Sequence, residues 1–200
     1  MIKVENVTVH NLARAIYSAR NAMNSWDKSD SDLENDVIGE NDLELAKRLV
    51  KSGSPHRKFL RQIFVTMDIT APLYFWRQFD TYKIGTVANS TSTMHTLHKR
   101  DLTLDDFSTD GMDDMDMMRL ERVIKEINDN RQMYVKSKEK IYWRGMVMLL
   151  PSCFNQMRTV SMNYEVALNI YNQRKGHKLT EWEQFRQAVE LLPYMKELIE

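Results

Sequence analysis

The chain has 200 residues, long enough for one domain with a sizeable hydrophobic core and too short for two comfortable ones. Its 28 lysine and arginine residues balance 28 aspartate and glutamate residues, so the overall charge does not favour a nucleic acid polymer or an anionic membrane as partner. A local cluster of two or three cations can still bind one phosphate group in a protein of zero net charge.

Cysteine content and hydropathy indicate the cellular compartment in which the protein is expected. A single cysteine, Cys153, excludes an internal disulfide and is typical of a reducing environment. The N-terminal residues lack the charged-then-apolar pattern of a signal peptide, and no stretch approaches the roughly 18 apolar residues of a membrane span. We therefore expect a single domain over residues 1–200, in the cytoplasm.

The N-terminal fifth of the chain predicts a strand, a helix and a loop. Residues 2–9 are β-prone with a loose alternation, which is typical of a strand. Asn11 is expected to cap a helix that runs from Leu12 to about Met23. The polar stretch 24–40, with its repeated serine and aspartate residues, is expected to be a surface loop.

The next segment predicts helix, strand and helix. A helix is expected over Asn41–Val50, capped by its first residue and closed by Gly53. Alternating apolar residues over Arg61–Thr70 predict a strand. The strand ends before Pro72, which is placed in the first turn of an aromatic-rich, buried helix over Leu73–Phe79.

The stretch Thr81–His98 has neither a helical nor a strand period. It is rich in threonine, serine, asparagine and glycine. Loops with many small hydrogen-bonding side chains often carry ligand sites, but a polar linker has the same composition. From composition alone both readings stay open.

The C-terminal half alternates long helices with a strand, which indicates an α+β or α/β chain without internal repeats. Aspartates at the start of the first helix complement the helix dipole, and a metal site there is less favoured because no histidine is near. The methionines of this half are expected to pack as adaptable filler. The predicted elements are helices over 112–138, 139–149, 163–174 and from 180, and a strand over 154–162; the aspartates are Asp110, Asp113, Asp114 and Asp116, and the methionines Met112, Met115, Met117, Met118, Met146 and Met148.

General catalytic motifs are absent from the sequence. It contains no P-loop, no GxGxxG, no HExxH and no CxxC pair. A lone cysteine such as Cys153 is more often a small buried residue than a nucleophile. His95 and His98 have a spacing seen in metal ligands, but without a third ligand they are expected at the surface or in hydrogen bonds.

Two neighbouring segments resemble the flavin-dependent thymidylate synthases. In residues 56–79, as in that family, a histidine-led turn precedes a strand, an Ala-Pro, an aromatic-rich helix and an Arg-Gln pair. The family then continues with the signature RHRxxSxNExSxRY, which Thr81–His95 matches in part. Lys83 takes the place of the last arginine of RHR and Thr86 that of the first serine. With one residue inserted, the asparagine, glutamate and second serine of the signature meet Asn89, Ser90 and Ser92.

A third segment carries the resemblance into the C-terminal half. There the family has a Leu-Pro that ends a helix, a strand that leads to an asparagine-started helix, and an arginine before a tryptophan. The matching residues are Leu150, Pro151, Asn163, Asn169, Arg174, His177 and Trp182. The resemblance covers about residues 1–195 and is most specific over 56–95 and 149–182.

The resemblance implies a fold, an activity and a set of site residues. The fold is α+β, an antiparallel sheet flanked by helices, assembled as a homotetramer with sites shared between subunits. The activity is transfer of a one-carbon group from methylenetetrahydrofolate to a deoxyuridine nucleotide, with FAD as cofactor and NADPH as reductant. Implied substrate contacts are Gln78, Ser90, Ser92 and Arg174, the last to the nucleotide phosphate; implied flavin contacts are His56, Lys83, Asn89, Asn163 and Asn169.

The chain departs from the family pattern inside the implied site. Thr81 and Tyr82 replace two members of the RHR, which removes cationic partners for phosphate. The glutamate of the signature is replaced by Ser90, or by Asn89 in the ungapped register. An arginine expected four residues before Pro151 is Val147, with Arg144 one turn earlier as a substitute. Glu165 stands where the family has an arginine, and Arg61 where it has a glutamate; one interpretation is that this pair has exchanged roles.

Three hypotheses follow from the sequence. The first is an enzyme that uses flavin and folate on a pyrimidine nucleotide. The second keeps the fold and the nucleotide but changes the cofactor or the reaction, because a fold can persist after its chemistry changes. The third is a non-catalytic oligomeric nucleotide-binding or structural protein. We expect the segment rich in threonine, serine and asparagine after Gln78 to meet the end of the helix that bears Arg174, in the same or a neighbouring subunit, and to form an anion-binding cavity with it.

Overall fold

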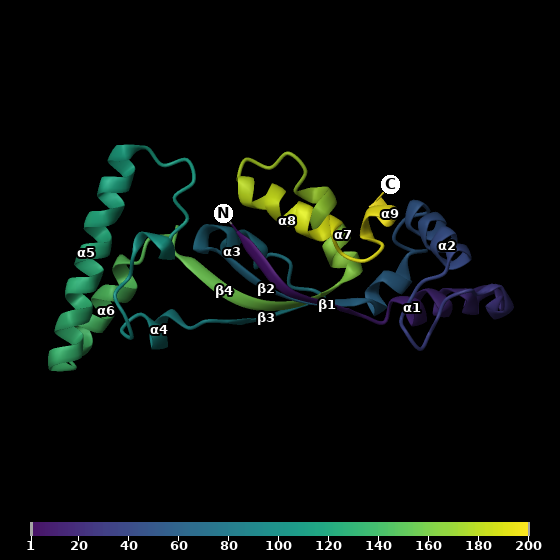
Figure 1. Ribbon diagram of the computed structural model, residues 1–200, viewed down its shortest axis with the longest axis horizontal. Coiled ribbons are helices and arrows are strands. Elements are labelled where there is room, and N and C mark those ends of the chain that lie inside the picture. The colour runs from purple at the N-terminus through teal and green to yellow at the C-terminus, as the bar shows by residue number, and fades with distance from the viewer. Residues whose placement is uncertain (1, 200) are drawn as a thin grey trace. The chain divides into compact units, whose positions relative to one another are not determined.

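The structure, a computed structural model, describes residues 2–199 (Figure 1). These residues form two compact units. The first unit contains residues 2–3, Ile69–Thr81 and Asn89–Arg158, and the second contains Val4–Asp68, Tyr82–Ala88 and residues 159–199. The expectation of one domain over residues 1–200 stays a prediction.

Within the described chain the strands form a four-stranded antiparallel sheet in the order β1-β2-β4-β3. Backbone and side-chain bonds give the register of β2 and β4: Tyr164 N donates to Ile63 O at 3.0 Å, and Thr66 Oγ1 lies 2.9 Å from Ser161 Oγ. As residue numbers rise along β2, the numbers of the paired residues in β4 fall, so the two strands are antiparallel. The strands are β1 (Lys3–His10), β2 (Phe64–Pro72), β3 (Thr86–Ser90) and β4 (Asn155–Asn163).

The second unit packs its helices around large aromatic side chains. Trp182, Tyr164 and Phe185 are fully buried, and the Tyr164 hydroxyl donates to Pro193 O at 3.0 Å. Burial raises the pKa of the Tyr164 phenol, so this group stays protonated. Helices α7 and α8 lie side by side (Figure 1). The helices of this unit are α1 (Leu12–Ala19), α2 (Glu40–Lys51), α7 (Tyr164–Gln173), α8 (Thr180–Glu190) and α9 (Met195–Ile199), with 3-10 helices over Arg20–Met23, Trp26–Lys28 and Lys58–Gln62.

The first unit is built on a helical hairpin in which α5 and α6 pack side by side (Figure 1). Leu120, Ile127 and Met146 are buried in its core together with Cys153. Cys153 is buried, as expected for a small core residue, and burial raises the pKa of its thiol. The helices of this unit are α3 (Leu73–Phe79), α4 (Thr93–Thr96), α5 (Asp114–Ser137) and α6 (Lys140–Leu149), with a 3-10 helix over Leu104–Asp106.

Most predicted elements are confirmed to within one or two residues, and the differences lie at their ends. The helix from Leu12 stops being α-helical at Ala19. The predicted strand over Arg61–Thr70 begins only at Phe64, because Arg61 belongs to a 3-10 helix. Pro72 is the last residue of β2 and the N-cap of α3, not part of its first turn. No helix in residues 2–199 combines the length and the apolar character needed to cross a bilayer.

Two predicted helix caps were wrong. Asn11 does stand at the N-cap of α1, but its φ is 69° and its side chain donates to Gln62 O at 2.8 Å instead of capping the helix. Helix α2 begins at Glu40, before Asn41, and an aspartate of the preceding loop caps it. Asp30 accepts from the backbone N–H of Asn41 at 2.8 Å. A contact across a loop of eleven residues leaves no local signal in the sequence.

The aspartates at the start of α5 lie at the positive end of the helix dipole, as expected. Asp113 is the N-cap, and its carboxylate accepts from Asp116 N at 2.8 Å. No group of three or more potential metal ligands occurs among residues 2–199. His95 is exposed, and the His98 ring packs edge-on against Tyr134 with ring centroids 5.6 Å apart.

The stretch Thr81–His98 contains regular structure that its composition hid. Strand β3 lies at the edge of the sheet, and four of its five residues are exposed. An edge strand exposed on both faces needs no hydrophobic alternation, so no strand period appears in the sequence. Ser92 then caps the short helix α4, and its hydroxyl accepts from His95 N at 3.3 Å.

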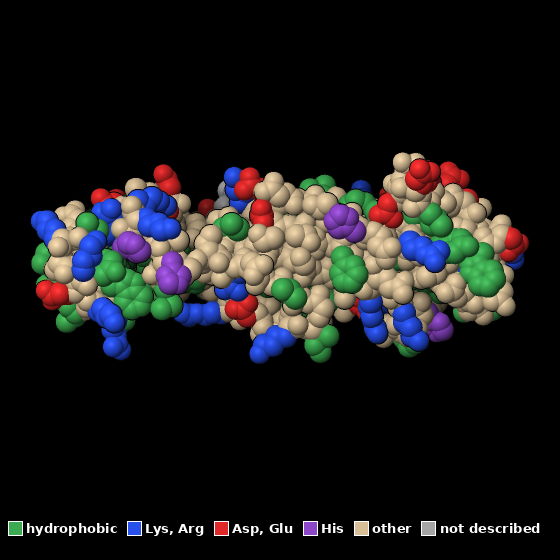
Figure 2. Space-filling model, turned by 90° about the horizontal axis from the view of Figure 1, so that it is seen from below, with side chains coloured by type: hydrophobic (Ala, Val, Ile, Leu, Met, Phe, Trp, Pro, Cys, Tyr) green, Lys and Arg blue, Asp and Glu red, His purple; other side chains and the backbone are tan. Residues whose placement is uncertain are grey.

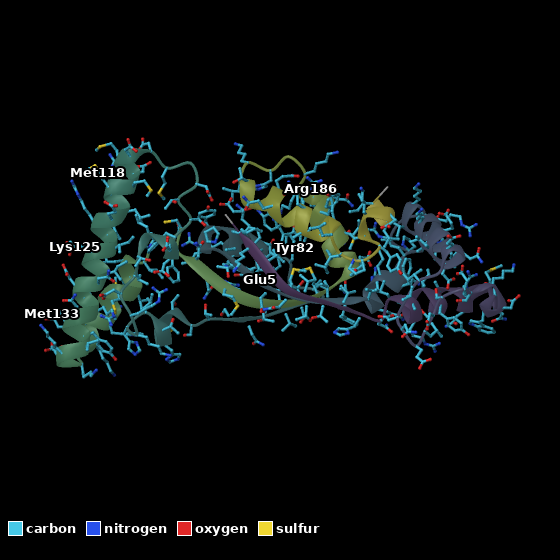
Figure 3. All side chains as sticks on the ribbon, in the orientation of Figure 1. Glu5, Tyr82, Met118, Lys125, Met133 and Arg186 are labelled. Atoms are coloured by element: carbon cyan, nitrogen blue, oxygen red, sulfur yellow. The ribbon has the colours of Figure 1, made fainter. Side chains whose placement is uncertain are left out.

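The methionines divide into packed and exposed groups. Met146 is fully buried and Met112 packs against the same core, as expected. Met115, Met118 and Met148 are instead 48–72% exposed, so the prediction that they fill a core was wrong for these three. Met118 projects from the side of α5 that is turned away from α6 (Figure 3). Figure 2 shows apolar side chains among lysines and arginines on the surface of this hairpin.

Candidate functional site

Arg174 forms one end of the candidate site, directly after the last residue of α7. Its Nε donates to the Tyr82 hydroxyl at 2.9 Å, and its guanidinium carbon lies 4.3 Å from the centroid of the Trp182 ring. A guanidinium stacked on an aromatic face gains a cation–π attraction and loses freedom of movement. Gly176, at a φ of 68°, turns the chain away after the helix.

The other end of α7 is fixed by an asparagine cap and a close backbone approach. The Asn163 side chain accepts from Val166 N at 3.0 Å, as the resemblance to an asparagine-started helix implied. Asn163 N donates to Gly85 O at 3.3 Å. A Cβ at Gly85 would lie 2.7 Å from Asn163 Nδ2, and the φ of Gly85 is 74°, so only glycine fits this position. The segment Tyr82–Ala88 therefore runs along α7, with Tyr82 at its last turn and Gly85 at its first.

Glu165, in the first turn of α7, has a buried carboxylate that binds two arginines. The Glu165 side chain is only 8% exposed, and it accepts from Arg61 Nε at 2.5 Å and from Arg57 Nε at 3.3 Å. Arg57 also donates through Nη2 to Asn169 Oδ1 at 3.0 Å. The two positions with reversed charge, Arg61 and Glu165, thus form an ion pair with each other. Two guanidinium groups against one carboxylate leave this cluster with one net positive charge.

A cavity of about 400 Å³ lies beside this cluster, within the size range of small-ligand sites. Its walls combine a guanidinium, a carboxylate, two amides and two aliphatic side chains. Amides and a cation next to apolar surface suit a heterocycle that carries an anionic group. The lining residues are Arg61, Ile84, Asn163, Glu165, Val166 and Asn169.

A second cavity of about 410 Å³ in the same unit is lined by His56 and Lys58. Its floor includes the buried ring of Phe59, and Gln62 lines it from the end of the 3-10 helix. Gln62 Oε1 accepts from the Ser18 hydroxyl at 2.8 Å. The cavity thus offers an imidazole, an ammonium group and an aromatic wall.

Five of the nine predicted site residues belong to the second unit, where they lie in separate places. Asn163 and Asn169 line one cavity and His56 the other, whereas Lys83 is exposed in the turn between Tyr82 and Gly85. Arg174 completes this group. The remaining four belong to the first unit: Gln78 on α3, Asn89 and Ser90 on the exposed β3, and Ser92 at the cap of α4. Their ligand contacts stay predictions.

Sequence reasoning missed two residues that shape the site. Tyr82 was interpreted only as the loss of a cation, yet its hydroxyl bonds both Arg174 and Gln173. An aromatic side chain in a stretch of small polar residues was the available signal. Arg57 was passed over beside His56, although it stands at the N-cap of the 3-10 helix that carries Arg61.

Comparison with known proteins places these features in a family. A profile of the thymidylate synthase complementing proteins matches residues 3–199. A comparison with curated proteins found no match. Among solved structures, thymidylate synthase X of Helicobacter pylori, determined with FAD and dUMP, is similar at a TM-score of 0.72 and 16% identity, and the match covers 100% of this chain and 97% of that one.

A second solved structure is a UMP/dUMP methylase of Streptomyces cacaoi bound with 5-bromo-dUMP. It has a TM-score of 0.65 and 15% identity, and the match covers 99% of this chain and 94% of that one. At such identities these likenesses show the fold, and they confirm the expected α+β architecture with an antiparallel sheet. Because the profile spans nearly the whole chain, the protein belongs to the thymidylate synthase complementing protein family, as the resemblance to flavin-dependent thymidylate synthases indicated.

Proposed function

We propose that the protein is a flavin-dependent thymidylate synthase-type enzyme, which transfers a one-carbon group from methylenetetrahydrofolate to a deoxyuridine nucleotide. The observation that carries this proposal is the ordered guanidinium of Arg174 at the end of α7. It donates a hydrogen bond to Tyr82 and stacks on Trp182. NADPH as reductant, a homotetramer and a cytoplasmic location belong to the same proposal.

The nucleotide phosphate is assigned to Arg174. A planar guanidinium suits a phosphate because two parallel N–H groups can bond two of its oxygens. Gln78, Ser90 and Ser92 are assigned to hydrogen bonds with the rest of the nucleotide. Gln78 and Ser92 present an amide and a hydroxyl, the groups that discriminate a pyrimidine ring and its sugar by hydrogen bonding.

The residues present also fit a flavin nucleotide. FAD combines heterocycles with a diphosphate, and the cavity beside α7 offers the amides of Asn163 and Asn169 and the guanidinium of Arg61. The net positive charge of the Arg57–Arg61–Glu165 cluster offsets part of the charge lost with the family's RHR. His56, Lys83 and Asn89 are the further assigned contacts. When bound, FAD supplies hydride transfer, and the protein residues orient it.

The UMP/dUMP methylase among the similar structures supports a second candidate, namely a one-carbon transfer to a different pyrimidine nucleotide. Thr81 and Tyr82 carry no charge where the family signature has cations, which favours an altered cofactor or pose. The non-catalytic nucleotide-binding alternative predicts affinity for the nucleotide without turnover.

Binding of FAD, dUMP and UMP to the purified full-length chain tests the proposal. We expect a flavin absorbance band after incubation with FAD, and a rise in melting temperature with dUMP that Arg174→Ala abolishes. A rise with nucleotide and none with FAD would support the altered-cofactor candidate. A chain whose melting temperature responds to neither ligand contradicts both. Complementation of thymidine-requiring cells then separates the enzyme from the non-catalytic alternative.

A further inference from the structure

Tyr82 contacts Arg174 through both its ring and its hydroxyl. The guanidinium carbon lies 5.3 Å from the centroid of the Tyr82 ring and 4.3 Å from that of Trp182. The two rings meet edge to face, with centroids 6.2 Å apart at 67°. Trp182 is fully buried and packs edge-on against Phe185, so one side of this arrangement is rigid. Figure 3 shows Tyr82 next to α7.

The hydroxyl of Tyr82 uses both its hydrogen-bonding roles at the same end of α7. It accepts from Arg174 Nε at 2.9 Å and donates its one proton to Gln173 Oε1 at 3.1 Å. A phenolic hydroxyl has a single proton, so the bond to Gln173 orients its lone pairs toward Arg174. The contact through Nε fixes the rotation of the guanidinium plane.

Such a contact matters for a binding arginine because the side chain is long and has many rotamers. Ordering it when the ligand arrives costs affinity, and a side chain that is already ordered avoids that cost. Trp182 alone restrains the distance of the guanidinium from the ring but not its rotation above it. The bond from Nε to the Tyr82 hydroxyl restrains this rotation.

We propose that Tyr82 is a positioning residue, which holds the guanidinium of Arg174 in the orientation that binds the nucleotide phosphate. This inference rests on the proposed function, because it takes the phosphate of a pyrimidine nucleotide as the ligand of Arg174. Tyr82 stands at the histidine position of the family signature. The tyrosine thus replaces the histidine of the signature and at the same time orders the guanidinium of Arg174.

The test separates the phosphate contribution from the rest of nucleotide affinity. The dissociation constants of dUMP and of deoxyuridine are measured for the full-length protein. The deoxyuridine constant divided by the dUMP constant reports how much the phosphate contributes to affinity. Tyr82→Phe keeps the ring and removes the hydroxyl. We expect it to shrink the ratio about tenfold, since about 1.4 kcal/mol corresponds to tenfold and a hydrogen bond to a charged group is of this size. The affinity for deoxyuridine and the melting temperature stay as in the wild type.

Tyr171→Phe is the matched control. It removes a phenolic hydroxyl from α7, the helix that Tyr82 contacts, but one whose partner is Glu190. We expect it to leave the ratio unchanged. In an Arg174→Ala background, which by itself shrinks the ratio further, Tyr82→Phe should have no additional effect, because the residue it positions is gone.

Three outcomes overturn the inference. A Tyr82→Phe protein with the wild-type ratio shows that the hydroxyl does not position Arg174. An equal loss of dUMP and deoxyuridine affinity shows a merely structural role, and so does an effect that persists in the Arg174→Ala background. A wild-type protein that binds dUMP no better than deoxyuridine contradicts the phosphate assignment of the proposed function itself, and this result is distinct from the others.

Discussion

Each unit of the molecule contains an arginine stacked on a tryptophan, and the two arginines have different partners. In the first unit the guanidinium carbon of Arg158 lies 4.3 Å from the Trp76 ring, and Nη1 donates to the Asp80 carboxylate at 2.7 Å. In the second unit Arg174 stacks at the same 4.3 Å on Trp182, but its Nε donates to the uncharged Tyr82 hydroxyl. Stacking alone therefore does not distinguish Arg158 from Arg174, the arginine that we propose to bind the nucleotide phosphate.

The partner of each arginine makes the difference. A carboxylate neutralises a guanidinium and occupies the donors that a phosphate would need. A hydroxyl orders the guanidinium through a hydrogen bond without itself adding an opposite charge. The Arg57–Arg61–Glu165 cluster lies between these cases, because one carboxylate serves two arginines. Three kinds of variant test this comparison. They remove the Glu165 carboxylate, exchange the charges of Arg61 and Glu165, or remove Arg158.

The largest expected effect follows from Glu165→Gln. The substitution keeps the shape of the side chain and leaves Arg57 and Arg61 facing each other without their carboxylate. Loss of one partner of a buried ion pair typically costs about 3–5 kcal/mol, and exposure of Arg61 reduces this to about 2–4 kcal/mol in the free energy of unfolding. Urea denaturation measures the change.

Glu44→Gln is the control for that experiment. Glu44 pairs with Lys47 one turn along α2, and the two side chains are 66% and 31% exposed. Exposed pairs of this kind contribute little to stability, so we expect a small change. Equal losses in the two variants would contradict a special role for the buried carboxylate.

Exchange of the charges gives the next largest effect. Glu165→Arg alone puts three arginines together, and addition of Arg61→Glu restores one ion pair in the reverse sense. We expect the double variant to recover about 1–2 kcal/mol relative to Glu165→Arg, as coupled neighbours do. Full recovery is not expected, because Arg57 would then face an arginine at position 165. A double variant no more stable than Glu165→Arg would show that the two positions are not coupled.

The sequence predicted those parts of the fold that carry a hydrophobic period. Alternation over β2 and helical spacing in α5 and α7 place buried residues at regular intervals, so these elements were found with nearly correct ends. Strand β3 was not found, because both its faces are exposed and its pairing depends on β4. The exposed methionines show the same limit, since helical spacing alone does not tell what covers a face.

The site divides in the same way. Asn163, Asn169 and Arg174 could be named from the family motif, and Arg61 and Glu165 could be named as reversed charges. The contact between Arg61 and Glu165 joins residues 104 positions apart, so their pairing could only be guessed. The role of Tyr82 could not be predicted for a different reason. The family motif shows which residue is replaced at this position, but only the structure shows that the tyrosine contacts Arg174.

A smaller effect is expected from Arg158→Gln, which tests the structural arginine directly. The variant loses the stacking on Trp76 and the bond to Asp80, whose side chain is 55% exposed. Together these contribute about 1 kcal/mol to the free energy of unfolding. The ratio of deoxyuridine to dUMP dissociation constants should stay unchanged, in contrast to Arg174→Ala. A reduced ratio would show that the carboxylate partner does not mark Arg158 as structural.

The smallest effect concerns Asn163, which serves both the fold and the cavity. Asn163→Ala removes the side chain that accepts from Val166 N, and loss of an N-cap costs about 1 kcal/mol. Asn163→Ser keeps an oxygen at the cap but removes the amide from the cavity wall. If the amide also binds flavin, both variants should weaken FAD binding, while only the alanine variant lowers the urea midpoint. A serine variant that binds FAD like the wild type would restrict Asn163 to capping α7, and the cavity's affinity for flavin would then have to come from Arg61 and Asn169.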